Sequence, residues 1–222
     1  MRAKALVVMA KAPIAGQVKT RLVPPFSSEQ AAELYRCLLE DLLEEIRSFS
    51  LADRFVAYTP AEAAPFFAET VPIEFARFPQ RGLDLGERMH AIFADLAANG
   101  YKSTVLVGSD LPLFPRQFLE QAFGALGRGG ADVVLGPSRD GGYYLLGMGR
   151  PVPGIFVNMG WGSDQVLSTT LRRLDDLAVT VSLLPEWFDL DTAADILRVR
   201  SLSAESNWNA SPRTARWLEQ NR

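Results

Sequence analysis

Lys4-Ala-Leu-Val-Val-Met-Ala10 is a short, continuous apolar run, and it is followed by a long loop and then by a segment with helical periodicity. The run predicts a strand that is buried on both faces. Residues 11–27 contain three prolines and one glycine, which predicts a loop. Apolar residues recur every three or four positions over 28–47, and Ser27 with Gln30 fits a capping box at the start of this helix. The stretch therefore predicts a strand–loop–helix unit.

The rest of the chain alternates strand and helix patterns in the same way. We expect strands at residues 54–59, 73–78, 104–107, 132–135, 143–146 and 179–184. We expect helices at residues 61–69, 84–98, 115–126, 163–176 and 191–202. This alternation indicates an α/β fold, a three-layer α/β/α arrangement with a mainly parallel, mixed sheet. Ligands of such sheets bind outside the carboxyl ends of the strands, so polar clusters that follow a strand are candidates for a site.

Length and composition limit the class of protein. At roughly 150 residues per domain, 222 residues predict a single domain, which we place at 1–202, followed by a polar tail at 203–222 with a short helix that carries Trp217 and Leu218. The net charge of −3 argues against binding to nucleic acid. One cysteine and one histidine exclude an intramolecular disulfide, a cysteine-cluster metal site and any mechanism that needs two histidines. No apolar run is long enough for a membrane span, so we expect a cytoplasmic protein.

The first polar cluster is the loop Lys11-Ala-Pro-Ile-Ala-Gly16-Gln-Val-Lys19-Thr-Arg21-Leu22, directly after the first strand. Residues 1–28 contain five basic residues and no acid, although the chain is acidic as a whole. A glycine that permits close backbone approach, combined with cations, suits a polyphosphate. The alternative is a basic surface loop. The position after a strand and the local absence of acids favour phosphate binding.

Carboxylates follow two later strands. Gly108-Ser109-Asp110-Leu-Pro112 ends the strand at 104–107, and Asp189-Leu-Asp191 follows the strand at 179–184. Mg²⁺ typically takes one or two carboxylates together with phosphate oxygens, so Asp110 with either Asp189 or Asp191 could form a metal site. The alternatives are local: Asp110 as a turn former before proline, and Asp191 or Thr192 as the cap of the next helix.

Three further groups could line a pocket. Asp140-Gly141-Gly142-Tyr143 lies between two strands, where it is either a hairpin turn or a backbone-rich wall against a flat ligand, with Tyr143 as a stacking or hydroxyl contact. Arg81 or Arg88 could reach a second anionic group, or both could be solvated charges at the end of a helix. Trp161 could form a pocket wall or belong to the core.

Four motifs together resemble a known family: Lys11-x-Pro-x-x-Gly16-x-x-Lys19-Thr-Arg21-Leu22, Gly108-Ser-Asp110-x-Pro112, Asp140-Gly-Gly-Tyr143 and Asp189-x-Asp191-Thr-x-x-Asp195. They are similar to those of bacterial GT-A-type proteins described as nucleotide-diphospho-sugar transferase-like or glycosyltransferase-like, and of the related phospholactate guanylyltransferases. The resemblance covers about residues 5–200. It implies that Lys11, Gly16, Lys19 and Arg21 hold nucleotide phosphates, with Gly108 and Ser109 nearby. It also implies that Asp110 and Asp191 hold Mg²⁺ (or Mn²⁺), with Asp189 as the competing candidate.

The resemblance implies a Mg²⁺-dependent transferase. Our leading hypothesis is nucleotidyl transfer, guanylyl in type, from a nucleoside triphosphate to a phosphorylated small-molecule acceptor, with Lys19, Arg21 and Asp110 as the catalytic residues. A glycosyltransferase that uses a nucleotide sugar is the alternative, although the metal motif is not the Asp-x-Asp of many such enzymes. A nucleotide-binding module without turnover is the third hypothesis. The sequence leaves the base, the acceptor and the oligomeric state open.

Overall fold

The structure is a computed structural model, and it describes residues 4–127, 130–205 and 211–221, the side chains of 203–205 excepted. Among these residues seven strands form a sheet in the order β3-β2-β1-β4-β6-β5-β7. All neighbouring strands are parallel except β6, which runs antiparallel to both β4 and β5. The strands are β1 (Lys4–Lys11), β2 (Asp53–Thr59), β3 (Phe75–Pro79), β4 (Ser103–Gly108), β5 (Val133–Pro137), β6 (Tyr143–Met148) and β7 (Val181–Leu183). The predicted mainly parallel, mixed sheet is confirmed.

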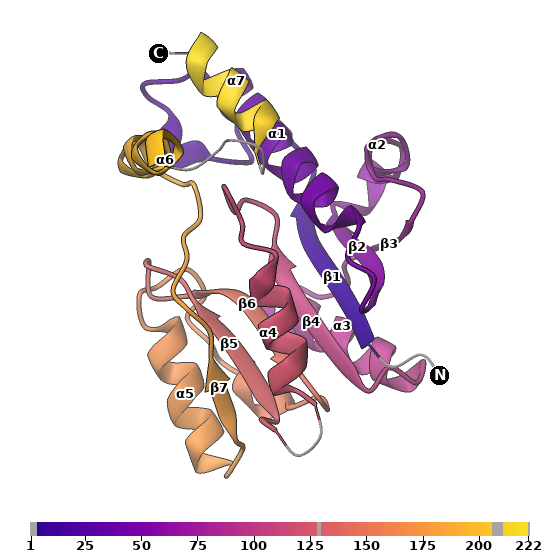
Figure 1. Cartoon of the computed structure of the whole chain (residues 1–222). Helices are drawn as coiled ribbons and strands as arrows, with labels where there is room; N and C mark the ends of the chain where they lie inside the picture. Colours follow the sequence, from indigo (N-terminus) through magenta and orange to yellow (C-terminus); the bar gives the residue numbers. More distant parts are fainter. Residues whose placement is uncertain (1–3, 128–129, 206–210, 222) are drawn as a thin grey trace.

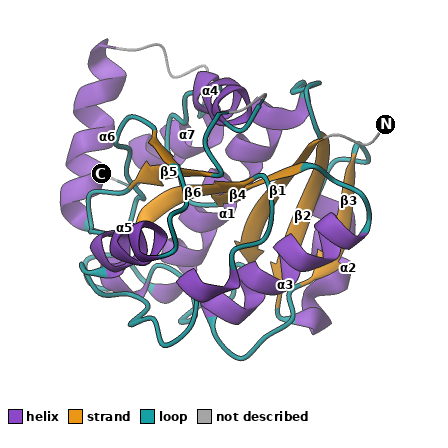
Figure 2. Ribbon diagram, turned by 90° about the horizontal axis from the view of Figure 1, so that it is seen from below, coloured by secondary structure: helices purple, strands orange, loops and turns teal. Residues whose placement is uncertain are grey.

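Helices cover both faces of this sheet, as Figures 1 and 2 show. Alternate residues of β1 enter two separate cores: Leu6 and Val8 pack with α1, α2 and α4, whereas Ala5 and Val7 pack with α3 and α5. This alternation produces the three layers, because successive side chains of a strand point to opposite faces. The helices are α1 (Ser28–Arg47), α2 (Ala64–Thr70), α3 (Leu85–Ala98), α4 (Gln117–Ala125), α5 (Val166–Asp176), α6 (Ala193–Glu205) and α7 (Pro212–Gln220).

The start of α1 confirms the predicted capping box. The Gln30 amide donates to Ser27 Oγ at 3.2 Å, and the Ser27 amide donates to Gln30 Oε1 at 2.9 Å. Two amide groups that the helix itself leaves without a partner are thereby satisfied.

Strand and helix ends differ from prediction where turns intervene. The strand predicted from residue 73 begins at Phe75, because the Phe75 amide donates to Pro72 O in a turn, and Ile73 is 87% exposed. The helix predicted at 61–69 is a 3₁₀ turn at Ala61–Ala63 followed by α2. Apolar character alone does not separate a turn residue from a strand residue.

The C-terminal segment contains the helix that the sequence predicts around Trp217 and Leu218. This helix, α7, packs along α1 (Figure 1), and both side chains are buried there with residues of α1 and α6. The predicted boundary at 202/203 falls inside α6. None of the described helices is long and apolar enough to span a membrane.

Candidate nucleotide-binding site

The loop after β1 is folded by two residues in the left-handed region. Gly16 has φ +78° and Lys19 has φ +49°. Only glycine adopts such angles without strain, so the position of Gly16 depends on its missing side chain. A 3₁₀ turn, Thr20–Leu22, follows, and Leu22 is completely buried against α1. This anchor turns the Lys19 side chain back toward the carboxyl ends of the strands.

Lys19 lies between two carboxylates. Its Nζ donates to Asp110 Oδ2 and to Asp191 Oδ1, both at 2.7 Å, and only 2% of its side chain is exposed. Burial alone would lower the pKa of Lys19, but the two carboxylates outweigh this and raise the pKa above its usual range. Lys19 in turn outweighs burial at Asp110 and lowers the pKa of that carboxyl. Lys19 and Asp110 are therefore both charged at neutral pH.

Asp191 reaches this point through residues 184–192, which cross the carboxyl edge of the sheet. The crossing segment is fixed by its main chain: the Leu184, Trp187 and Leu190 amides donate to Leu135 O, Pro137 O and Asp110 O. Asp195 Oδ2 accepts the Thr192 amide at 2.8 Å and the Thr192 hydroxyl at 2.7 Å. Asp195 and Thr192 thus cap α6 between them, so the Asp191 carboxylate is left free to meet Lys19.

Asp189 is a third carboxylate of the site. Its Oδ2 accepts the Ser138 hydroxyl at 2.8 Å. Burial, and then the charge of Asp110, raise the pKa of Asp189 to about 8. A Cβ on Gly108 would lie 3.2 Å from Asp110 Oδ1 and 3.8 Å from Asp189 Oδ1, so both carboxylates converge above this glycine. The raised pKa of Asp189 follows first from burial and second from this crowding.

The carboxylate oxygens of Asp110, Asp189 and Asp191 fit a divalent cation that is also bound by the ligand. Within the described part of the chain no three His, Cys, Asp or Glu side chains form a ready cage for a metal ion. Mg²⁺ commonly binds one or two carboxylates and completes its shell with phosphate oxygens and water. A pair drawn from Asp110, Asp191 and Asp189 fits that use. Two carboxylates are too few for a metal ion that is held by protein ligands alone.

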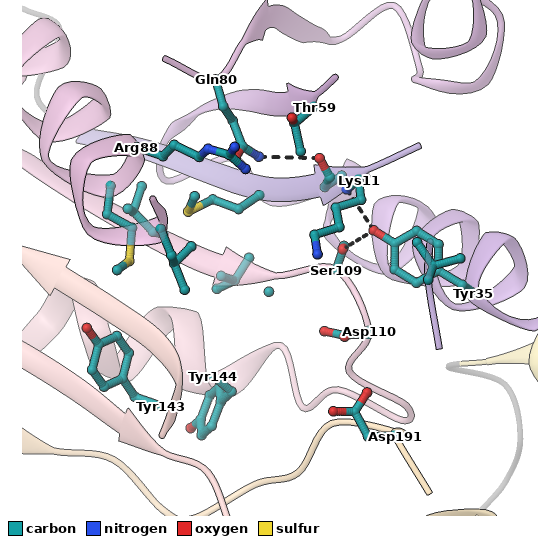
Figure 3. A pocket seen from close by; sticks show the side chains of 18 of the residues that line it. Lys11, Tyr35, Thr59, Gln80, Arg88, Ser109, Asp110, Tyr143, Tyr144 and Asp191 are labelled. Atoms are coloured by element: carbon teal, nitrogen blue, oxygen red, sulfur yellow. Dashed lines mark hydrogen bonds between the residues drawn. The ribbon is translucent and has the colours of Figure 1, made fainter. Parts of the chain in front are cut away.

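A cavity of about 610 Å³ opens above this cluster, at the carboxyl ends of β1, β2 and β4. Figure 3 shows side chains from distant segments converging on it. Eight of the residues predicted from sequence line it: Lys11, Lys19, Arg21, Gly108, Ser109, Asp110, Tyr143 and Asp191. Arg21 is 64% exposed at the side chain and lies 3.9 Å from Asp191 Oδ2.

The other predicted residues lie elsewhere. Gly16 shapes the loop without lining the cavity. Asp140, Gly141 and Gly142 form the hairpin turn between β5 and β6, where Asp140 Oδ1 accepts the Gly142 amide at 3.0 Å.

Three further predicted residues lie outside the cavity wall. Arg81 pairs with Asp95 at a second cavity. Trp161 packs on Gly86, where a Cβ would lie 2.7 Å from Trp161 Cζ2. Asp189 stands behind Asp110 and is not part of the cavity wall.

Sequence reasoning missed several polar residues that line the cavity, among them Tyr35, Thr59 and Gln80, whereas Arg88, one of the two arginines considered for an anionic group, does line it. Gln80 donates from Nε2 to Ala57 O at 2.8 Å and so joins β3 to the neighbouring strand. Thr59 ends β2 and Gln80 follows β3, so the rule that sites lie after strands could have found both. Tyr35 occupies a core position of α1, where periodicity gives no hint of a role for its hydroxyl.

Comparison with known proteins assigns the chain to a family. Residues 42–163 match the family described as "Uncharacterized protein conserved in bacteria (DUF2064)", and the chain belongs to it. A protein from Desulfovibrio desulfuricans G20, provisionally named a nucleotide-diphospho-sugar transferase, is 32% identical, with a TM-score of 0.90 over 100% of this chain and 96% of that one. The sequence resemblance to such transferase-like proteins is thereby confirmed. No curated protein matches the chain.

More distant solved structures share the fold. A CMP:2-keto-3-deoxy-manno-octonic acid synthetase complexed with CTP is 12% identical, with a TM-score of 0.58 over 91% of this chain and 99% of that one. The 4-diphosphocytidyl-2C-methyl-D-erythritol synthase from Anaerococcus prevotii is 9% identical, with a TM-score of 0.59 over 90% and 96%. At these identities the similarity establishes the nucleotide-diphospho-sugar transferase fold alone.

Proposed function

We propose that this protein is a transferase that moves a nucleoside monophosphate from a nucleoside triphosphate to a phosphorylated small-molecule acceptor, with Mg²⁺ (or Mn²⁺) as cofactor. The observation that carries the proposal is the Lys19 ammonium, held 2.7 Å from both Asp110 and Asp191 beside a cavity of about 610 Å³. A buried cation next to two carboxylates and an open cavity suits a ligand that brings both phosphates and a metal ion.

The residues of the loop and of the β4 end take the phosphates in this proposal. Lys11, Lys19 and Arg21 supply positive charge, and Gly16 shapes the loop. The small residues Gly108 and Ser109 let the phosphates lie close to the backbone. Asp110 and Asp191 would hold the metal ion, because both are carboxylates that line the cavity and both contact the same cationic group, Lys19. Asp189 fixes Asp110 from behind. Mg²⁺, when bound, neutralises charge on the phosphates.

The reaction needs no protein base. An oxygen of the acceptor phosphate forms a bond to the α-phosphorus, the bond from that phosphorus to the bridging oxygen breaks, and pyrophosphate leaves. The attacking oxygen is already an anion, which agrees with a site that has carboxylates and cations but no histidine on its wall. The residues accelerate the reaction by positioning and by stabilising charge.

Glycosyl transfer from a nucleotide sugar is the second candidate. It is favoured by the provisional name of the Desulfovibrio protein, which covers the same length at 32% identity. Both reactions use a bound nucleotide with phosphates, and they differ in the bond that breaks. The guanylyl type rests on the sequence resemblance, whereas the distant structures with nucleotides in their names concern cytidine compounds.

The test is a binding screen followed by product analysis. The four nucleoside triphosphates and a set of nucleotide sugars are titrated with and without Mg²⁺, and unfolding temperature is recorded. We expect stabilisation by one triphosphate that requires Mg²⁺, and release of pyrophosphate when phosphorylated acceptors are added. Stabilisation by nucleotide sugars alone would support glycosyl transfer. Tight binding without product from any acceptor would support a module without turnover.

A further inference from the structure

Tyr35 connects two strands of the site through one hydroxyl. It is a residue of α1 and only 3% exposed. The Lys11 amide, at the end of β1, donates to Tyr35 Oη at 2.9 Å, and Ser109 Oγ, just after β4, lies 2.6 Å from the same oxygen. Figure 3 shows these contacts beside the cavity. Tyr35 therefore contacts two segments of the proposed phosphate site at once.

The surroundings of Tyr35 fix the direction of this hydrogen-bond chain. An amide can only donate, so the Lys11 amide uses an acceptor position of Tyr35 Oη. A buried hydroxyl hydrogen needs an acceptor, and among the described residues Ser109 Oγ is the one that the structure provides. Tyr35 keeps its proton at neutral pH, because burial, and then the charge of Asp110, raise its pKa to about 12. Tyr35 thus donates to Ser109.

The consequence concerns the hydrogen of Ser109. Since Ser109 Oγ accepts from Tyr35, its own hydrogen must point in another direction. No hydrogen bond takes up that hydrogen within the part of the chain described here, and Ser109 lines the cavity next to Asp110. A hydroxyl in this state offers a hydrogen to a ligand. An anionic phosphate oxygen is the acceptor that gains most from it.

We propose that Tyr35 is a positioning residue that makes Ser109 a hydrogen-bond donor toward the phosphate chain of the substrate. The inference rests on the proposed function, because it takes the ligand to be a nucleotide phosphate. Without Tyr35, the Ser109 hydroxyl can turn its lone pairs to the ligand, and the Lys11 amide loses its acceptor. A purely structural Tyr35 would stabilise α1 on the sheet without affecting the ligand.

Calorimetric titration of two probes tests the proposal: Mg²⁺ with GTP, and Mg²⁺ with inorganic tripolyphosphate, which has no base. Ser109→Ala and Tyr35→Phe should each weaken binding about tenfold, the usual size for one hydrogen bond to a charged oxygen. The double variant should bind no worse than Ser109→Ala within about twofold, because both changes remove one donor. Ser109→Thr keeps the hydroxyl and should restore affinity to within about threefold of the original protein.

Tyr101→Phe is the matched control. The Tyr101 hydroxyl donates to Asp53 Oδ2 at 2.7 Å, away from the cavity of the site, and the residue is 7% exposed. Its loss should lower the unfolding temperature and leave the affinity for both probes unchanged.

Three results overturn the inference while the proposed function stands: unchanged binding by Tyr35→Phe, unchanged binding by Ser109→Ala, or additive losses in the double variant. If Tyr35→Phe does not fold, the affinities of Ser109→Ala and Ser109→Thr are compared instead. Equal affinities of these two variants contradict a donor role of the Ser109 hydroxyl. If the unaltered protein binds neither probe nor any other nucleoside triphosphate of the screen, the proposed function itself fails.

Discussion

Asp41 and Asp110 are both carboxylates in largely buried surroundings, and the structure uses them in opposite ways. Asp41, on α1, has 1% of its side chain exposed, and its two oxygens accept four hydrogen bonds from Arg213 and Thr214 at the start of α7. Asp110, after β4, has 28% of its side chain exposed and meets one ammonium beside a cavity.

The difference separates a structural carboxylate from the one that we propose binds the metal ion. Every hydrogen-bonding position that Asp41 offers is occupied by the chain itself, including the amides of a helix N-terminus, which favour negative charge. Asp110 shares its cation with Asp191, lies close to the carboxylate of Asp189 and lines the cavity. A crowded, incompletely paired carboxylate at a cavity marks a site better than burial does.

The largest expected effect is at Asp110. Asp110→Asn should lower Mg²⁺-dependent turnover at least about a hundredfold, since one metal ligand and its charge are lost. Stability should fall by less than about 2 kcal/mol, because Asn fills the same volume and Lys19 keeps its 2.7 Å contact with Asp191. Steady-state kinetics and urea unfolding measure the two quantities. Asp132→Asn, at the amino end of β5, is the control and should retain turnover; equal activity of Asp110→Asn would contradict the assignment.

Asp41→Ala should show the reverse pattern. We expect a loss of about 2–4 kcal/mol in the free energy of unfolding, because two backbone amides and two side chains of α7 lose a charged acceptor. Nucleotide affinity should stay unchanged. The neighbouring Glu40→Ala, which removes ion pairs with Arg36 and Arg213, should cost less than about 1 kcal/mol. If folded Asp41→Ala protein binds the nucleotide more weakly, Asp41 and Asp110 do not differ in the way that we describe.

Lys19→Met separates the two tasks of the ammonium. Without it, Mg²⁺ with a nucleoside triphosphate should bind about tenfold to a hundredfold more weakly, because a charge-assisted contact is lost. Mn²⁺ alone should bind more tightly, because Asp110 and Asp191 no longer have a cation between them. Calorimetry measures the nucleotide, and paramagnetic resonance measures free Mn²⁺. Lys102→Met, an exposed lysine before β4, should change neither; weaker Mn²⁺ binding by Lys19→Met would argue against Asp110 and Asp191 as ligands.

The smallest effect is expected at Gly16. An added Cβ would meet nothing within 4 Å, but φ is +78°, so Gly16→Ala should cost about 1 kcal/mol through backbone strain alone. Gly124→Ala is the matched control: it also has open space but lies within α4, so it should stabilise the protein by about 0.5–1 kcal/mol. Chemical denaturation compares the two. If both substitutions increase the free energy of unfolding, the loop tolerates a side chain at Gly16.

The sequence predicted the layers of the fold and the basic loop after β1, because these depend on local patterns. The apolar run of β1, the capping box at Ser27 and the concentration of basic residues before residue 28 are visible without tertiary structure. Arg81 and Trp161 illustrate the limit of such patterns: each follows a strand or precedes a helix, yet Arg81 pairs with Asp95 and Trp161 packs on Gly86. A motif indicates which chemistry is available, and packing decides the direction of the side chain.

By itself, the sequence determined the alternation of strands and helices, the caps and the residue types of the site, since each depends on neighbours a few positions apart. Only the tertiary structure decided which carboxylates meet. Asp110 is 91 residues from Lys19 in the chain and Asp191 is 172 residues away, and they meet because residues 184–192 return from β7 across the sheet edge. The Tyr35 hydroxyl is part of the site for the same reason. Contacts over such separations depend on strand order and on packing between elements, which no local pattern records.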